Sequence, residues 1–415
     1  MCLLTKTFLK AAYLSRLCPV RSSKGINLPT TSSARFMTSS SSSSSFASTR
    51  DRVVFSGIQP TGALHIGNYF GAVKHWIDLQ KQPFTSLIIE IADLHSVTEF
   101  QHPDELYNSI FDITAALLAC GIDPSVTILF QQSSVPYHAE LAWLLSAFVT
   151  LPFLQTLGHY KDKASRFKQN AVPPGLLMYP VLQASDILLY RATHVPVGRD
   201  QEQHIQVCHH IVRQLYSRFS LDESSADVLF PMPEMLLSTA PKIKSLRNPD
   251  KKMSKSDVTD KSRIEIRNTP EEMREKIKKA LTDFESAVFY ERNYRPAVSN
   301  LMELHSIITG KSIEDITQES VDLNTAQYKQ VIADAVEDYF LPVHKEYVRL
   351  RSEKQYLRQV LENGRVNATE IAAATMYAVR KLFGLDVQSD MVKYLADELR
   401  TRPLIEDELR KLPSG

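Results

Sequence analysis

Short apolar runs alternate with helical repeats along the front half of the chain. The segments Val53–Ser56, Leu87–Ala92 and Thr127–Phe130 are short and apolar, which predicts buried strands. Apolar residues recur at helical spacing between these segments, at Ile66, Phe70, Val73 and Ile77 and then at Leu106, Ile110, Ile113 and Leu117. Pro103 and Gly121 mark the start and the end of the second helix. This β-α-β-α-β order predicts an α/β fold built on a parallel sheet with crossover helices.

The strand pattern fades after about Thr269, and the rest of the chain has helical periods. The predicted helices are Pro270–Leu281, Asn300–Thr309, Ala326–Phe340, Pro342–Gly364, Ala368–Phe383 and Asp390–Leu399. We therefore divide the chain into a leader (residues 1–50), a parallel-sheet domain (residues 51–269) and a C-terminal α-helical domain (residues 270–415).

The composition is that of an ordinary globular protein. The 415 residues are 43% hydrophobic and 23% charged, which is enough chain for two domains. The net charge is +1, so any contact with nucleic acid must come from a local basic patch. The four cysteines form no Cys-x-x-Cys pair, which disfavours a disulfide framework and a cysteine-based zinc site. The longest apolar run, Leu141–Leu154, is too short to cross a bilayer, and we expect no membrane association.

The leader has a distinct composition. Residues 1–50 contain seven Lys and Arg residues and no Asp or Glu, and Ser39–Ser45 is an unbroken run of serines. A basic, serine-rich and acid-free N-terminus is typical of an organellar transit peptide. The alternative is a disordered tail without an addressing role.

Two glycine-containing segments follow the first predicted strand. Gly57–Gly62 (GIQPTG) forms the turn, and His65–Asn68 (HIGN) opens the next helix. A helix N-terminus presents free N–H groups and a partial positive charge, which suits a phosphate. Gly67 allows a flat nucleotide to approach the backbone closely. His65 and Asn68 can donate hydrogen bonds to phosphate or ribose. The alternative is a plain turn between strand and helix with a solvated histidine.

A lysine-rich segment lies far downstream. Lys252–Ser256 (KMSKS) stands in a polar, glycine-free stretch. Its two lysines, with small hydroxyl residues beside them, can wrap a polyphosphate on a mobile loop. A solvated basic loop is the alternative, but this particular pentad is rare by residue frequency.

The His65–Asn68 motif followed downstream by the Lys252–Ser256 motif resembles the signature pair of class I aminoacyl-tRNA synthetases. Gly57–Asn68, Leu182–Tyr190 (LQASDILLY), Val195–His204 (VPVGRDQEQH) and the lysine motif are similar to segments of tryptophanyl-tRNA synthetases, in particular the organellar branch. The resemblance implies a Rossmann-like nucleotide-binding domain followed by a helical anticodon-binding domain. It also implies ATP with Mg²⁺ as a substrate, tryptophan and tRNA(Trp) as partners, and a homodimer. With the leader, it points to the mitochondrial matrix.

The implied reaction has two steps. The tryptophan carboxylate attacks the α-phosphorus of ATP, and the acyl group then moves from the adenylate to a ribose hydroxyl of tRNA. A carboxylate is already a nucleophile, so we expect positioning and charge neutralisation rather than a general base. The resemblance assigns Lys252 and Lys255 to the pyrophosphate leaving group and brings Lys163 near the same phosphates. A surface pair with Asp162 is the alternative for Lys163.

The resemblance assigns further ATP contacts. These are Gln59, Pro60, Thr61, His65, Gly67, Asn68, Gly198, Arg199, Asp200, Ile243, Met253, Ser254 and Ser256. Asp200 can accept both ribose hydroxyls. Departures from the family pattern include Arg199, which replaces an acid, and His159, which replaces a glutamine.

Asp186 is the residue expected to select the amino acid. Indole has one polar atom, which is a donor-only N–H. A pocket that selects tryptophan therefore needs one buried acceptor among apolar walls, and the neighbours of Asp186 are apolar. The alternative is an N-cap for a helix at Ile187–Tyr190. The rest of the expected pocket is Phe55, His95, Tyr179, Gln183 and Gln201.

Other readings of the sequence stay open. His204, Cys208 and His209 lack further ligands at zinc spacing, so we expect no protein-bound structural metal. A tyrosyl-tRNA synthetase would share the architecture and the pocket aspartate. A small-molecule nucleotidyltransferase would not need the long helical part, and a non-catalytic RNA-binding relative would not need the lysine motif.

Overall fold

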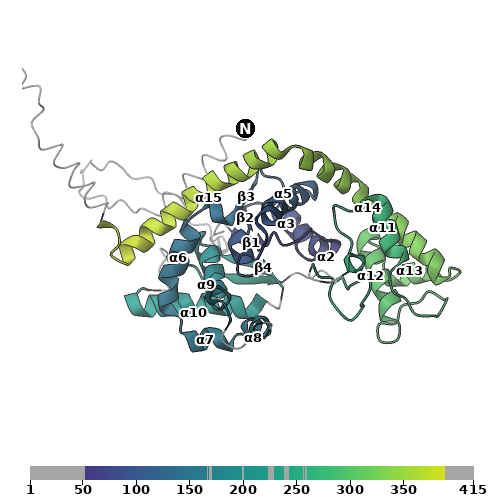
Figure 1. The fold of residues 1–415 in the computed structure, drawn as a ribbon, viewed down its shortest axis with the longest axis horizontal. Coiled ribbons are helices and arrows are strands. Elements are labelled where there is room, and N and C mark those ends of the chain that lie inside the picture. Colours follow the sequence, from purple (N-terminus) through teal and green to yellow (C-terminus); the bar gives the residue numbers. More distant parts are fainter. Residues whose placement is uncertain are drawn as a thin grey trace, which may run out of the picture.

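A parallel sheet lies at the centre of the protein (Figure 1). The structure is a computed structural model that describes residues 52–165, 167, 171–198, 201–222, 229–237, 243–255, 257 and 259–387. Within them, the strands are β1 (Arg52–Ile58), β2 (Thr85–Ile91), β3 (Thr127–Gln131), β4 (His194–Val197) and β5 (Glu234–Leu237). They are all parallel and are ordered β3-β2-β1-β4-β5. The predicted α/β sheet is therefore confirmed.

The helices cover the sheet and extend beyond it. Those of the sheet region are α2 (Ile66–Asn68), α3 (Lys74–Leu79), α4 (Asp93–Ser96), α5 (Pro103–Ala119), α6 (Tyr137–Leu145), α7 (Leu151–Thr156), α8 (Gly158–Ala164), α9 (Pro174–Leu189) and α10 (Glu202–Phe219). A π-helical stretch, Tyr69–Val73, joins α2 to α3. The C-terminal helices are α11 (Pro270–Lys278), α12 (Pro296–Thr309), α13 (Ile313–Glu319), α14 (Thr325–Ser352) and α15 (Lys354–Leu382).

Alternating side chains of the strands pack into two apolar cores, one on each face of the sheet. In β2, Leu87, Ile89 and Ile91 pack into the core that also holds α3, α5 and α14. Ile88 points to the other face, where α6, α9 and α10 pack. Successive side chains of a strand point to opposite faces, so Glu90 shares the face of Ile88. This alternation therefore directs the Glu90 side chain toward the face that α9 covers.

The C-terminal helices differ from the prediction. Three helices were expected between residues 326 and 383, but two long ones are present, and both Pro342 and Gly364 lie inside them. Proline removes only one backbone donor, and the helix on both sides of Pro342 is held by buried residues such as Phe340 and Leu350. The helix expected at Asp390–Leu399 lies outside the described residues.

Helix α15 returns to the sheet and lies along β3 (Figure 1). An added Cβ at Gly364 would lie 1.8 Å from the carbonyl oxygen of Leu129, so only glycine permits this approach. Ala368, Ala372 and Met376 then enter the same core as α9 and α10. The helical part therefore packs on the sheet part, and the division at residue 269 stays a prediction.

The apolar run Leu141–Leu154 is divided among α6, a short 3₁₀ turn at Ser146–Phe148 and α7. Across the described residues, every helix is too short or too polar to span a membrane.

Candidate active site

The main cavity lies where the chain reverses its direction of travel across the sheet. The chain runs from β1 to β2 and β3 on one side and returns to β4 and β5 on the other. A cavity of about 450 Å³ opens there, lined by Phe55–Gln59 at the end of β1 and by Val195–Val197 of β4. A neighbouring cavity of about 260 Å³ shares Gln59, His95 and Lys163 with it. Open α/β sheets bind ligands at this switch point.

His65 begins the first helix as a buried cap. Its Nδ1 accepts a hydrogen bond from the backbone N–H of Asn68 at 3.2 Å, and the Asn68 side chain accepts one from the backbone of His65. Burial, then the charges of Lys255, Arg263 and Lys252, lower the pKa of His65 to about 3. The ring is therefore neutral, with its proton on Nε2. It is 1% exposed, so the solvated alternative is wrong.

The two motifs meet in space although they are far apart in the sequence. Backbone hydrogen bonds join Ile66 to Ile264 at 2.9 Å and Ile266 to Leu64 at 2.8 Å. These bonds hold the chain after the lysine motif beside the first helix. Lys255 Nζ then donates to the carbonyl of Gln59 at 3.4 Å. The contact places the ammonium group over the turn that follows β1.

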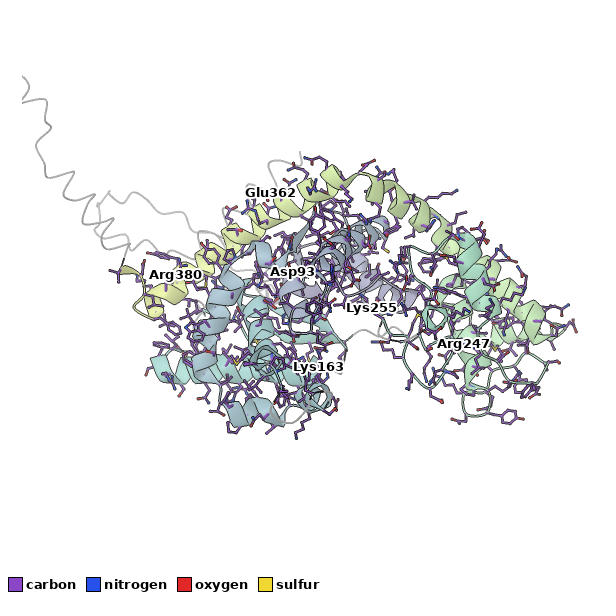
Figure 2. All side chains as sticks on the ribbon, viewed as in Figure 1. Asp93, Lys163, Arg247, Lys255, Glu362 and Arg380 are labelled. Atoms are coloured by element: carbon purple, nitrogen blue, oxygen red, sulfur yellow. The ribbon has the colours of Figure 1, made fainter. Side chains whose placement is uncertain are left out.

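The three candidate lysines surround the two cavities. Lys252 lines the larger cavity, Lys255 lines the smaller one, and Lys163 lines both. Figure 2 labels Lys163 and Lys255. Burial lowers the pKa of Lys255 to about 8, against the attraction of Glu265. Lys163 Nζ lies 3.7 Å from Oε1 of Glu99, so the half-buried lysine pairs with Glu99 instead of with Asp162 as in the alternative. The arrangement places positive charge around a space suited to a polyphosphate.

Asp186 lies at the floor of the larger cavity, inside α9 rather than at a helix start, so the N-cap alternative is wrong. It is 1% exposed and has three partners. His95 Nε2 lies 2.8 Å from Oδ2, while Gln132 Nε2 at 2.9 Å and His138 Nδ1 at 2.6 Å reach Oδ1. Burial favours the neutral acid, but the bonds from His138 and His95 outweigh it and lower the pKa of Asp186. The carboxylate is therefore ionised.

Three residues of this cluster were missed by the sequence prediction. Gln132 and His138 come from the stretch after β3, and nothing in their spacing pointed to Asp186. Glu90 lines the cavity and is 2% exposed. A signal for Glu90 was present, because it is the one acid within the apolar run Leu87–Ala92.

The other predicted contacts are distributed as follows. Phe55, Asn68, Tyr179, Gln183 and Gln201 line the larger cavity, together with the departing residue His159, and Thr61 lines the smaller one. Pro60, Gly67, Ile243 and Met253 are buried and line neither cavity, and neither do His65, Gly198 and Ser254. Arg199, Asp200 and Ser256 lie outside the described residues.

Two groups have the residue types of a metal site. His204 bonds to Tyr179 and Gln201, while Cys208 is fully buried in the apolar core, so these residues do not converge as ligands. Glu90, His95 and Asp186 each place one ligand atom within 4.8 Å of the others. The bond between His95 and Asp186 already joins two of these three, which fits a hydrogen-bond network.

A parallel sheet, a helix start suited to phosphate, and a lysine-bearing loop beside it define a nucleotide-binding enzyme of the Rossmann type. The sequence model of the family described as "tRNA synthetases class I (W and Y)" matches residues 47–341. The tryptophan–tRNA ligase of Rickettsia conorii is 38% identical over 334 residues, which cover 80% of this chain and 98% of the relative. The chain belongs to the tryptophan–tRNA ligases of this class I family.

Two further relatives extend the comparison. The mitochondrial tryptophan–tRNA ligase of Schizosaccharomyces pombe is 36% identical over 351 residues, covering 80% of this chain and 96% of the relative. The tryptophanyl-tRNA synthetase of Campylobacter jejuni, solved with ADP and tryptophan, has a TM-score of 0.69 at 28% identity. That match covers 80% of this chain and all of the solved chain.

Proposed function

We propose that the protein activates tryptophan with ATP and transfers it to mitochondrial tRNA(Trp). The observation that carries the proposal is a single cavity in which a buried carboxylate, Asp186, lies near the lysine-bearing motif. The tryptophan carboxylate attacks the α-phosphorus of ATP, and pyrophosphate leaves. The ribose hydroxyl of the tRNA terminus then attacks the adenylate carbonyl and releases AMP.

In the amino-acid half of the site, Asp186 accepts the indole N–H. A carboxylate has about four acceptor positions. Two on Oδ1 are taken by Gln132 and His138, and one on Oδ2 is taken by His95. One position on Oδ2 is therefore not taken by these three donors. Phe55 and Ile187 supply apolar wall, and Tyr179, Gln183 and Gln201 complete the pocket.

In the ATP half, the turn Gln59–Thr61 and the start of α2 hold the nucleotide, while Gly198, Arg199 and Asp200 hold the ribose. Lys252, Lys255 and Lys163 neutralise the charge that develops on the leaving pyrophosphate. Mg²⁺ accompanies the ATP. Glu99 is the one carboxylate among the described residues that line the smaller cavity. Phosphate oxygens and water would therefore supply most of the ligands of the Mg²⁺ ion.

Amino-acid-dependent exchange of pyrophosphate into ATP tests this assignment. The full chain should show exchange with tryptophan and not with tyrosine. Asp186→Asn keeps the size but loses the charge, and it should raise the KM for tryptophan roughly 10- to 100-fold, because a hydrogen bond to a charged group is lost. Asp104→Asn, at an exposed position of α5, is the control. Exchange with tyrosine alone, or an unchanged KM in Asp186→Asn, would refute the proposal.

Transfer to tRNA needs its own assay. The helices beyond residue 269 pack on the sheet part and suit an anticodon-binding role, in a homodimer whose two subunits share one tRNA. Charging of tRNA(Trp) should occur, and sedimentation should give a dimer. Exchange without charging would favour a small-molecule nucleotidyltransferase, and tRNA binding without exchange would favour a non-catalytic relative.

The mitochondrial assignment rests on the leader and on one relative. Residues 1–50 have the composition of a transit peptide, and the relative from Schizosaccharomyces pombe is a mitochondrial ligase. Residues 1–50 fused to a fluorescent protein should bring it into the mitochondrial matrix. A diffuse signal, or a signal in a different organelle, would contradict the assignment.

A further inference from the structure

Glu90 lies where an acidic side chain is unfavourable. It is the last residue but one of β2, which lies between β1 and β3, and its neighbours in the strand are Ile89 and Ile91. The side chain is 2% exposed. A buried carboxyl group without a cationic partner tends to keep its proton, because the charged form loses its hydration.

The strand opposite leaves room for this side chain. Gly57 of β1 is the register partner of Glu90. A Cβ on Gly57 would lie 3.0 Å from both Cγ and Oε1 of Glu90. Gly57 is also the first residue of the turn motif. Part of the reason for glycine at this position is therefore the side chain across the strand pair.

Glu90 reaches the same cavity as Asp186. Its Oε2 is buried and has no hydrogen-bond partner among the described residues. Five titratable groups in the described part of the chain surround it. Asp186 and Tyr190 come from α9 and its end, His138 comes from α6, and Asp93 and His95 come from α4. The nearest cationic candidate, His138 Nδ1, lies 3.9 Å from Oε2 and already bonds to Asp186.

Glu90 and Asp186 each place an oxygen within 4.8 Å of the other, and two buried carboxyl groups at such a separation do not both ionise, so one of them keeps its proton. His95, His138 and Gln132 all donate to Asp186, which favours its ionised form. Burial, then the charge of Asp186, raise the pKa of Glu90 well above its usual range. The proton therefore resides on Glu90.

We propose that Glu90 is a positioning residue for the amino acid, a neutral carboxylic acid that keeps Asp186 as the single ionised acceptor of the pocket. The inference rests on the proposed role of Asp186 toward the indole N–H. If Glu90 were ionised, the second negative charge would draw a proton to Asp186. Asp186 would then carry an O–H at the position that the indole N–H must approach.

Variants at Glu90 in the full chain test the effect on the substrate. Glu90→Ala should raise the KM for tryptophan roughly tenfold and leave the KM for ATP unchanged, because Glu90 lies beside Asp186 in the larger cavity and does not line the smaller one. Glu90→Gln, which is neutral and similar in size, should restore most of the loss. Glu105→Gln, at an exposed position of α5, is the control. A Glu90→Gln enzyme as impaired as Glu90→Ala, or an equal rise in the KM for ATP, would overturn the proposal.

Infrared spectroscopy tests the protonation state without any reaction. At neutral pH, the difference spectrum of wild type minus Glu90→Gln should contain the carbonyl band of a protonated carboxylic acid. The difference spectrum for Glu105→Gln should not contain it. Absence of the band for Glu90 overturns the inference. If the wild type lacks tryptophan-dependent exchange, the proposed function fails, while the infrared result still reports the state of Glu90.

Discussion

Replacing Gly364 by alanine tests the contact that fastens α15 to the sheet. The new Cβ would lie 1.8 Å from the carbonyl oxygen of Leu129 and 2.6 Å from its carbonyl carbon. Both are backbone atoms of β3, so neither can turn away as a side chain could. The helix must move out from the strand, and Val360, Leu361 and Ala368 lose part of their packing.

Two opposing effects decide the size of the change. Alanine gains about 1 kcal/mol over glycine inside a helix. Overpacking costs about 1–3 kcal/mol and occasionally more, and a clash with a strand backbone belongs at the upper end of that range. The expected net result is a loss of roughly 2 kcal/mol in the free energy of unfolding.

Urea unfolding followed by circular dichroism measures this change. Gly71→Ala is the matched control, because Gly71 also lies in a helix and an added Cβ meets no atom within 4 Å. It should be neutral or slightly stabilising. If Gly364→Ala is as stable as the control variant, α15 does not approach β3 as described.

Three further predictions concern charged and titratable groups. The pKa of Lys255 is about 8, so its ammonium form is lost above that pH, and kcat/KM for ATP should fall there. Arginine stays charged, so a pH profile of kcat/KM that still falls in Lys255→Arg would contradict the role of Lys255 at the phosphates. His65 has a pKa lowered from 6.5 to about 3, so its contribution to stability is complete above pH 6.5 and is lost as the pH falls toward 3. His65→Asn, which keeps a capping oxygen, should unfold in urea with a weaker dependence on acid pH; an unchanged dependence would refute the buried neutral ring. Arg295 is 0% exposed and forms a two-bonded pair with Asp283, which is 35% exposed. Arg295→Lys should therefore lower the free energy of unfolding in urea by roughly 2 kcal/mol. Arg292→Lys, at a surface pair, should lower it by less than about 1 kcal/mol. Equal losses in the two variants would contradict the difference in burial.

The sequence predicted the elements whose signals are local. The strands β1, β2 and β3 and the helix that begins at Pro103 are present as expected, because their apolar spacing and end signals lie within a few residues. The course of the C-terminal helices was predicted wrongly. Proline and glycine usually end helices, but Pro342 and Gly364 are held inside them by packing against other elements.

The candidate site was also predicted only in part from the sequence. The residue types of His65–Asn68 and Lys252–Ser256 indicated phosphate chemistry without any knowledge of distance. The structure then joined the two segments through the backbone bonds of Ile264 and Ile266. It also placed Asp186 inside a helix, although residue type alone had favoured a cap.

The sequence by itself determined the α/β fold and the kind of chemistry, because periodicity and motif composition are properties of short segments. Only the tertiary structure decided which charged groups share a cavity. Glu90, His138 and Gln132 meet Asp186 from separate elements. Burial then keeps the proton on Glu90, whereas hydrogen bonds keep Asp186 ionised. Protonation depends on the distance to other charges and to water, and neither distance is encoded in local sequence.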